Sequence, residues 1–386
     1  MRNLLSIWRL AGSVSFVIGL AWSLPTSADP FAYITNTASD NLSIIDTATN
    51  TVVNTVTVGD TPVGVAVRPD GGAVYVANQN SNTVSVVDTS TNAVVNTVIV
   101  GASPFGVAMH PNGGAVYVAN QGSNTISVVD TLMNSVVDTV TVGSSPRGVV
   151  VHPNGATVYV TNNMSSNLSV IETTSHTVVD TVTVGSFPNG VAVHPDGTKV
   201  YVANDGSHTI SVIDAQSNTV VDTVAVGRHP IGVAVHPDGS NVYVANEGSD
   251  SVSVVDALSN TVVDTVIVGS RPEGITVHPD GGTLYVAKSS DNDVSAVDTA
   301  TNTVVATVAV GSLPWAYGQF IGPLPPSIGG SATALSTIFA ICRNVTTGSS
   351  VLIFIAPGEN SWDCEAAGLQ ALPGDVILMF EAGIAE

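Results

Sequence analysis

The stretch Ser81–Asn120 reads SNTVSVVDTSTNAVVNTVIVGASPFGVAMHPNGGAVYVAN, and near copies of it follow one another along most of the chain. Its tyrosine recurs every 42 residues, at Tyr33, Tyr75, Tyr117, Tyr159, Tyr201, Tyr243 and Tyr285. A repeat of 40 to 45 residues is typical of the four-stranded blades of β-propellers. Seven copies therefore predict one closed ring of seven blades.

Each repeat contains four short runs of strand-forming residues, such as GVAV, VYVAN, TVSVVD and VVDTVTV, which we name strands a, b, c and d. The runs are rich in Val and Thr, and Gly, Pro, Asn and Asp cluster between them, as in antiparallel strands. Blades pack face to face, so both faces of the innermost strand a are buried, which explains its apolar run. The pattern predicts an all-β fold with almost no helix.

The two ends of the repeat region are incomplete in complementary ways. Phe31 to Asn36 form a b strand with no strand a before them, and an a-like run, Trp315 to Ile321, follows the last connection. We expect three N-terminal strands and this C-terminal strand to complete one blade. Such a closure leaves no open sheet edge for pairing with other chains.

The N-terminal segment, residues 1–28, has the pattern of a secretory signal peptide. Arg2 and Arg9 precede the apolar stretch Leu10 to Trp22, and small residues follow before Asp29. The alternative is an uncleaved membrane anchor, but this stretch is shorter than the roughly 20 residues that span a bilayer. We predict a mature protein without membrane insertion, in the periplasm, outside the cell or at the cell surface.

The predicted mature chain is strongly acidic. Cleavage removes two of nine basic residues and none of the 30 acidic ones, which leaves a formal charge of 7 − 30 = −23. Such a surface repels phosphate backbones and anionic lipids, so nucleic acid is not an expected partner. Charged residues make up only 10% of the chain, which suits strands buried on both faces.

Residues 29–322 form the predicted propeller, and residues 323–386 are predicted to be a linker and a small β module. The segment begins PLPPSIGG and continues with the strand-like runs STIFAIC, SVLIFIA and DVILMFEAG. A module of this size has a marginal core, so it needs a cross-link or docking for stability. Cys342 and Cys364 are the two cysteines of the chain, and in an exported protein they favour one disulfide.

The repeats resemble the YVTN-type β-propeller family, with YITN, YVAN and YVTN standing beside VAVHPDG and VSVVDT. The resemblance covers about residues 30–322. It implies an exported or cell-surface seven-bladed propeller, in a family of which many members have no assigned activity. Related propellers include lactonases and domains of periplasmic redox enzymes, so the resemblance implies a fold and a compartment more than an activity.

Five histidines occupy one repeat position, in the turn between strands a and b, namely His110, His152, His194, His236 and His278. Zinc needs ligand nitrogens about 2.0 to 2.1 Å from the ion, whereas equivalent atoms on neighbouring blades lie on the order of 10 Å apart. We therefore expect each His to stabilise its turn and predict no metal. The chain also lacks phosphate-binding, haem-attachment and nucleophile motifs, so no cofactor is expected.

The connections from strand d to the next strand a carry residues that the repeat leaves free, and on one propeller face they lie beside the loops between strands b and c. This set of predicted ligand-binding residues comprises Arg147, Arg228, His229, Arg271, Glu273 and Trp315, with Lys288 from a b–c loop. We predict that they bind a small anion or the carboxylates of a protein partner. The alternative is that charges collect in loops because buried strands have no room for them.

The near identity of the blades favours a non-enzymatic binding or scaffold protein, since catalysis needs different residues from several blades at one point. One alternative is a lactonase-like or lyase-like enzyme that uses a metal, or a His and Glu pair, at the channel mouth, with His229, Glu273 and Glu247 as the residues concerned. A second alternative is a structural protein of the envelope that assembles laterally. The sequence leaves the ligand and the oligomeric state open.

Overall fold

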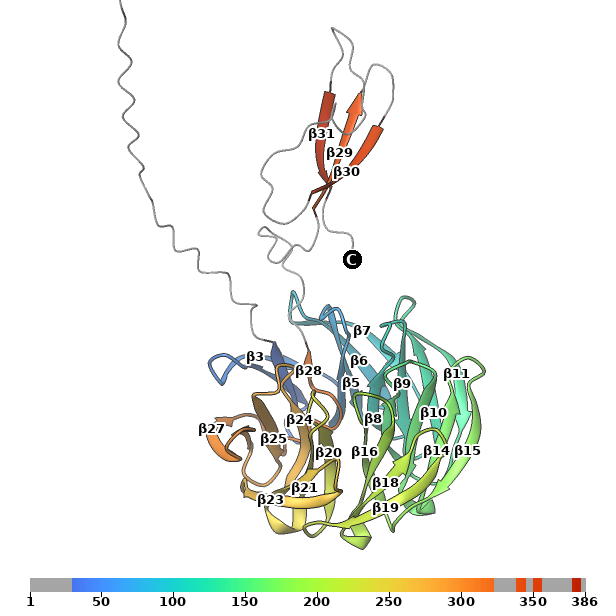
Figure 1. The fold of residues 1–386 in the computed structure, drawn as a ribbon, viewed down its shortest axis with the longest axis vertical. Coiled ribbons are helices and arrows are strands. Elements are labelled where there is room, and N and C mark those ends of the chain that lie inside the picture. The colour runs from blue at the N-terminus through green and yellow to red at the C-terminus, as the bar shows by residue number, and fades with distance from the viewer. Residues whose placement is uncertain (1–29, 323–337, 345–349, 356–376, 383–386) are drawn as a thin grey trace, which may run out of the picture. The chain divides into compact units, whose positions relative to one another are not determined.

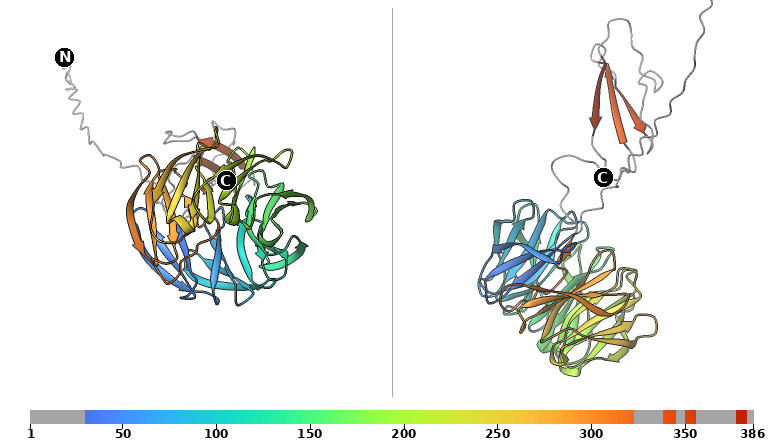
Figure 2. Two further views of the ribbon diagram at one scale, coloured as in Figure 1. Left: turned by 90° about the horizontal axis from the view of Figure 1, so that it is seen from below. Right: turned by 90° about the vertical axis from the view of Figure 1, so that its left-hand side faces the viewer.

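A computed structural model of the chain shows a ring of seven four-stranded antiparallel sheets (Figure 1). The structure describes residues 30–322 and the strand segments 338–344, 350–355 and 377–382. The first and last sheets of the ring are neighbours, as the blue and orange strands in Figure 2 show. The predicted all-β, seven-bladed fold is confirmed.

The predicted four-strand pattern is present in every blade. Strands a are β4 (Pro62–Val67), β8 (Pro104–Met109), β12 (Pro146–Val151), β16 (Pro188–Val193), β20 (Pro230–Val235), β24 (Pro272–Val277) and β28 (Ile321–Gly322). Strands b are β1 (Phe31–Asn36), β5 (Ala73–Asn78), β9 (Ala115–Asn120), β13 (Thr157–Asn162), β17 (Lys199–Asn204), β21 (Asn241–Asn246) and β25 (Thr283–Lys288).

Strands c and d complete the blades. Strands c are β2 (Asn41–Asp46), β6 (Thr83–Asp88), β10 (Thr125–Asp130), β14 (Asn167–Glu172), β18 (Thr209–Asp214), β22 (Ser251–Asp256) and β26 (Asp293–Asp298). Strands d are β3 (Thr51–Thr57), β7 (Ala93–Ile99), β11 (Ser135–Thr141), β15 (Thr177–Thr183), β19 (Thr219–Ala225), β23 (Thr261–Ile267) and β27 (Thr303–Ala309). In the propeller the helical elements are the 3-10 turns η1 (Asn163–Ser165), η2 (Asp205–Ser207) and η3 (Glu247–Ser249).

Blade 1 closes the ring as predicted, since β28 pairs with β1 in the order β28-β1-β2-β3. The closing segment is less regular than the expected strand Trp315 to Ile321. Pro314 and Ile321 pair with β1 in the same way as Pro62 and Val67 pair with β5 in blade 2. The segment from Pro314 to Ile321 is two residues longer than the segment from Pro62 to Val67. The extra residues bulge out of the strand, so only Ile321–Gly322 is regular.

The blades pack through the repeated tyrosines, each of which is at most 1% exposed. Near the ring axis, strands a come very close together at the glycine of each Pro-x-Gly connection. A Cβ on Gly148 would lie 2.3 Å from the carbonyl oxygen of Asn189 in the next blade, and one on Gly232 would lie 2.4 Å from that of Glu273. Glycine at this position therefore lets the inner strands pack in six blades, while blade 1 has Ala316 in its irregular closing segment.

The repeated histidines hold neighbouring blades together. In His110, His152, His194 and His236, Nε2 lies 2.9 to 3.0 Å from a glycine carbonyl oxygen in the a–b turn of the following blade. Because a carbonyl oxygen only accepts, Nε2 must donate in each pair. The sequence predicted a role within each turn, and the structure adds a bond between blades.

We expect His194→Ala to lower the free energy of unfolding by about 1 to 3 kcal/mol, because the carbonyl of Gly239 loses its partner in a partly buried place. Urea denaturation measures the change. His176→Ala is the control, since His176 pairs with Asp138 at the exposed rim, where such pairs contribute about 0 to 1 kcal/mol. Equal losses in the two variants would contradict the inter-blade role.

The C-terminal segment contains a three-stranded antiparallel sheet in the order β30-β29-β31, with β29 (Ile338–Asn344), β30 (Ser350–Ile355) and β31 (Ile377–Ala382). Cys342 lies in β29, but Cys364 lies outside the described residues, so the disulfide stays a prediction. The predicted signal peptide and the linker after Gly322 also lie outside them. Among the described residues, no helix is long and apolar enough to cross a membrane.

Candidate binding face of the propeller

The residue after each proline of the d–a connections lies at the ring axis, and it differs in all seven blades. We call this set the inner ring: Val63, Phe105, Arg147, Asn189, Ile231, Glu273 and Trp315. Six of these residues are the second residue of a strand a, and Trp315 precedes β28; each is followed by Gly or Ala at the close approach of the inner strands. The symmetry of the blades is therefore broken at the point where seven side chains converge.

Tyr317 closes the channel beneath the inner ring. Its backbone N–H donates to Val63 O at 3.1 Å, and its carbonyl accepts from Val65 at 2.9 Å, which anchors it to blade 2. Its hydroxyl donates to Asn189 Oδ1 at 3.1 Å in blade 5, on the other side of the axis. The side chain thus spans the channel, where it is 5% exposed.

The bulge that delivers Tyr317 depends on the glycine that follows. Gly318 has φ +119°, in a region that L side chains rarely adopt, and a Cβ there would lie 2.6 Å from the carbonyl oxygen of Val65. The ring of Phe105 packs edge-on against Tyr317 at 5.2 Å and against Trp315 at 5.4 Å between centroids. An aromatic cluster therefore makes up part of the floor of the d–a face.

Two buried donors of the inner ring lack acceptors. Arg147 Nε and Asn189 Nδ2 are both buried and have no hydrogen-bond partner among the described residues. They lie on adjacent blades at equivalent positions, and the hydroxyl of Tyr317 fixes the amide of Asn189 by occupying its oxygen. The Arg147 guanidinium lies 5.3 Å from the centroid of the Phe105 ring. A buried donor without an acceptor is costly, so Arg147 Nε and Asn189 Nδ2 are polar groups that the described residues leave unsatisfied.

Glu273 is the acid of the inner ring, and it is 1% exposed. Burial and the neighbouring carboxylate of Glu247 raise the pKa of Glu273 to about 8. It accepts a hydrogen bond from Ser289 Oγ at 3.1 Å, and Arg271 lies 3.8 Å away. At neutral pH the carboxyl is therefore mostly protonated, and it adds little negative charge to the face.

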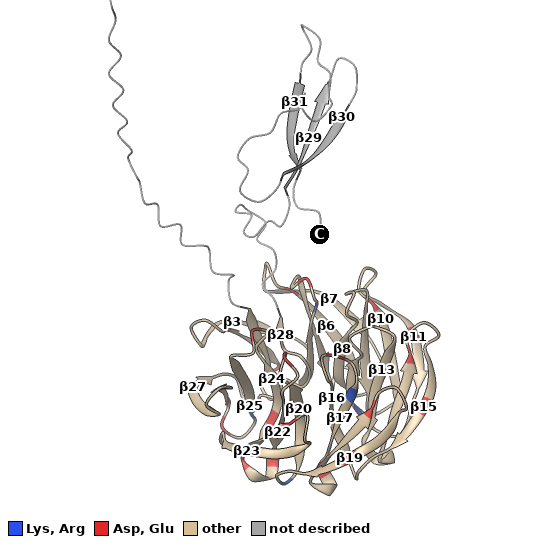
Figure 3. Ribbon diagram, in the orientation of Figure 1, with Lys and Arg blue, Asp and Glu red and all other residues tan. Residues whose placement is uncertain are grey.

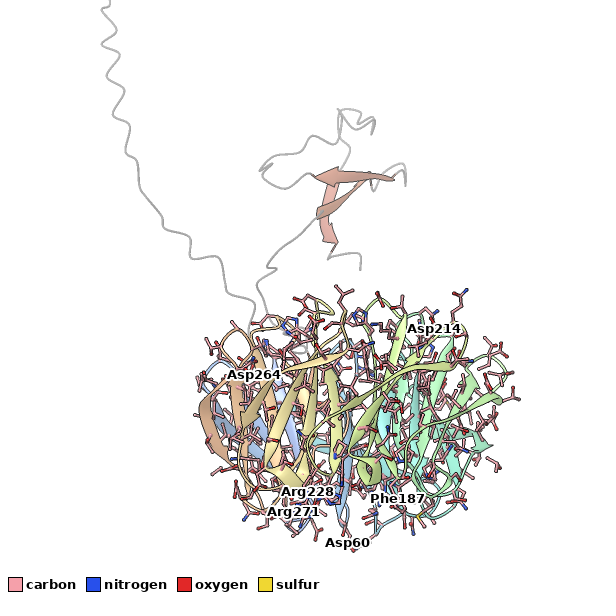
Figure 4. All side chains as sticks on the ribbon, turned by 60° about the horizontal axis from the view of Figure 1, so that its bottom comes forward. Asp60, Phe187, Asp214, Arg228, Asp264 and Arg271 are labelled. Carbon is pink, nitrogen blue, oxygen red and sulfur yellow. The ribbon has the colours of Figure 1, made fainter. Side chains whose placement is uncertain are left out.

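The outer loops of the same face carry other predicted residues, and most of these have acidic partners. Arg271 Nε donates to Glu247 Oε1 at 2.8 Å. His229 Nδ1 lies 2.7 Å from Asp205 Oδ1, and its ring packs edge-on against His208. Figure 4 shows Arg228 and Arg271 at the same end of the propeller. Arg228 is exposed and has no acidic partner among the described residues.

Lys288 is placed differently from the prediction. It ends β25, is 5% exposed, and its ammonium lies 2.9 Å from Asp293 Oδ1 and 3.4 Å from Asp291 Oδ2. The other six blades have a buried asparagine there, so the lysine and its two acids replace a repeated polar contact. The charge of Lys288 is therefore buried and paired, and we leave this residue out of the binding site proposed below.

The structure thus brings together Arg147, Glu273 and Trp315 on the inner ring and leaves Arg228, His229 and Arg271 on the outer loops. It does not assemble the predicted catalytic pair, since His229 pairs with Asp205 while Glu273 bonds with Ser289. Sequence reasoning missed Asn189 and Tyr317. Asn189 occupies the repeat position of Arg147, and a comparison of that position across the blades would have found it.

The opposite end of the channel is a cavity of about 680 Å³, closed by Tyr317 on its inner side. Valines of strands a line most of it, including Val149, Val191 and Val233, and the prolines of the a–b turns surround its mouth. Figure 3 shows few basic segments anywhere on the ring. The inner-ring residues Arg147, Asn189 and Glu273 are not among the residues that line this cavity.

Comparisons with known proteins agree with this architecture. The family model "Lactonase, 7-bladed beta-propeller" matches residues 130–262, about a third of the chain. No curated protein matches the chain.

Solved structures with the same fold include Kuenenia stuttgartiensis hydrazine synthase, at 24% identity and a TM-score of 0.65, covering 75% of this chain and 99% of that one. A functionally unknown protein from Desulfotomaculum acetoxidans has 18% identity and a TM-score of 0.64, covering 77% and 99%. A putative 6-phosphogluconolactonase from Bacteroides uniformis has 19% identity and a TM-score of 0.64, covering 74% and 98%. At these identities the solved structures show the fold of this chain, a seven-bladed propeller.

Proposed function

We propose that the protein is an exported, non-enzymatic binding propeller that holds a small carboxylate ligand, or the carboxylates of a protein partner, at its inner ring. The observation that supports this most is the pair of buried donors, Arg147 Nε and Asn189 Nδ2, without acceptors. A carboxylate has two acceptor oxygens, and charge-assisted bonds from arginine are among the strongest in proteins. The exported location rests on the N-terminal pattern and on the YVTN-type resemblance.

The surroundings of the two donors suit an anion attached to an apolar or sugar-like body. Phe105, Trp315 and Tyr317 form a rigid aromatic floor beside Arg147. The neutral form of Glu273 does not repel an anion, and its hydroxyl can donate to one. Arg228 stands at the exposed rim of the same face, where a basic residue assists the approach of an anion.

The test is a titration of the purified full chain with gluconate and 6-phosphogluconate at pH 7, measured by calorimetry, with glucose as the uncharged control. We expect the two anions to bind, and Arg147→Ala to weaken them at least tenfold, because a hydrogen bond to a charged group contributes about 1.5 to 3 kcal/mol. Arg228→Ala, at the exposed rim, serves as the matched variant and should change affinity less than threefold.

The same titration has a predicted pH dependence. Above pH 8 the carboxyl of Glu273 ionises, so the face gains a negative charge beside Arg147. Anion affinity should therefore fall between pH 7 and pH 9 in the wild type and stay constant in Glu273→Gln. Absence of anion binding by the wild type, or full affinity in Arg147→Ala, would contradict the proposed site.

A second candidate is lactone hydrolysis, favoured by the lactonase model match and by the raised pKa of Glu273, which suits a general acid or base near neutral pH. Hydrolysis of 6-phosphogluconolactone faster than in buffer alone, and abolished in Glu273→Gln, would replace the binding proposal with this one. Binding without turnover is the result that we expect.

A further inference from the structure

Lys199 fills a groove between blades 5 and 6, on the face formed by the a–b and c–d turns. It is the first residue of β17, and its ammonium donates to Ala257 O at 2.5 Å and to Asn260 Oδ1 at 3.4 Å in the next blade. An ammonium group is therefore bound between two blades, with a backbone carbonyl oxygen and an amide oxygen as acceptors.

The equivalent groove between blades 4 and 5 has the same acceptors but no lysine. One repeat of 42 residues before Lys199, Ala257 and Asn260 stand Thr157, Ala215 and Asn218. Thr157 is too short to cross the groove, and a pocket of about 330 Å³ is present, lined by Thr157, Tyr159 and Ala215 among others. The Oδ1 atom of Asn218 is buried and has no hydrogen-bond partner among the described residues.

The alanine in each of these two grooves is a departure from the repeat. Five blades have a threonine at this position, namely Thr47, Thr89, Thr131, Thr173 and Thr299, while blades 5 and 6 have Ala215 and Ala257. The threonine hydroxyl donates to the backbone beside its own a–b turn, as from Thr89 to Gly71 O at 2.6 Å. Alanine therefore leaves room where threonine fills the groove.

Blade 7 provides an internal contrast. Asn302, the counterpart of Asn218, also has a buried Oδ1 without a partner among the described residues. Its groove, however, contains Thr299, whose hydroxyl donates to Gly281 O at 2.6 Å. Between blades 4 and 5, the unpartnered oxygen and the missing threonine side chain coincide.

We propose that the groove between blades 4 and 5 binds a primary ammonium group from outside the chain, in the place that the Lys199 ammonium takes one blade further on. The acceptors are the carbonyl oxygen of Ala215 and Oδ1 of Asn218. Asp196 and Asp214 line the pocket, and hydrogen bonds from Thr198 and from Ser217, respectively, lower their pKa values, so both are ionised at neutral pH. A cation is thereby favoured over a neutral amine.

This site is separate from the inner ring. Asp214 lies at the end of the propeller opposite Arg228 and Arg271 (Figure 4). The ligand is a cationic alkylamine, which comes either from a free polyamine or from a lysine side chain of a partner. The acidic surface of the molecule attracts both.

The experiment titrates the full chain with 1,5-diaminopentane at pH 7 and low salt, and follows binding by calorimetry. We expect one saturable site in the wild type and at least tenfold weaker binding in Ala215→Thr, which restores the side chain of the other blades without a change of charge. Thr157→Lys should abolish binding, and Lys199→Thr should raise the stoichiometry from one to two. If Lys199→Thr does not fold, Ala215→Thr decides alone.

Tetramethylammonium is the matched control probe, because it has the positive charge but no N–H donor. We expect it not to compete. Competition by it, absence of saturable binding, or unchanged affinity in Ala215→Thr would overturn the proposal. A capped Gly-Lys-Gly peptide distinguishes the sources: if it binds as the diamine does, the site accepts a partner's lysine, and if the diamine alone binds, the ligand is a free polyamine.

Discussion

Phe320→Ala is expected to destabilise the propeller by about 3 to 5 kcal/mol, the usual cost of removing a buried phenylalanine side chain. Phe320 is fully buried in the closing segment, and its carbonyl accepts from the N–H of Tyr33 at 2.8 Å. Its core cluster contains residues of blades 7, 1 and 2, including Tyr285, Ile34 and Val74. The substitution therefore weakens the contact on which closure of the ring depends.

Urea denaturation measures the effect, and Phe187→Ala is the matched control. Phe187 is 48% exposed in a d–a connection, so its removal should cost less than about 1 kcal/mol. Limited proteolysis should also cleave the Phe320 variant within blade 1 sooner than the wild type, because an opened closing strand exposes the edge of β1. A loss in Phe320→Ala no larger than that in Phe187→Ala would contradict the closure.

Glu273→Gln is expected to change the pH dependence of stability by on the order of 4 kcal/mol. In the unfolded chain this carboxyl titrates near 4.5, whereas in the folded chain its pKa is about 8. Between these values the folded state binds the proton more tightly, so wild-type stability falls as pH rises from about 4.5 to about 8 and levels off above that. Glutamine does not ionise, so the variant lacks this loss.

The measurement compares wild type and Glu273→Gln by urea denaturation at pH 4.5 and at pH 9. Relative to the wild type, the free energy of unfolding of the variant should rise by on the order of 4 kcal/mol from pH 4.5 to pH 9. Glu172→Gln is the control, because Glu172 is exposed at the end of β14. This substitution should change the stability difference between pH 4.5 and pH 9 by less than about 1 kcal/mol. A parallel response of Glu273→Gln and wild type would show that the carboxyl is ionised in the folded state.

The repeat allowed the fold to be predicted because each strand depends on local alternation and on the packing of one blade against the next. Tyr201 and its six equivalents are buried for the same reason in every blade. The closing strand was predicted from the missing strand a of blade 1. Its bulge was not, because the direction that Tyr317 takes depends on contacts with Val63 and Asn189, which are distant in sequence.

The site was predicted less completely, since the repeat position indicates where a side chain starts but not what it pairs with. Arg147 and Glu273 lie near the axis because the residue after Pro leads into an inner strand, and their role in binding stays a prediction. Lys288 was expected in a b–c loop, whereas it ends β25, where two nearby acids allow its burial. The neutralisation of Arg271 by Glu247 likewise depends on side chains from adjacent blades.

The most direct test of the proposed function is a crystal structure of the full chain grown with 6-phosphogluconate. The proposal predicts an anion at the inner ring, with its oxygens within hydrogen-bond distance of Arg147 Nε and Asn189 Nδ2. Water alone at both donors, or an anion held only by the outer residues Arg228 and Arg271, would contradict the assignment of the inner ring as the binding site.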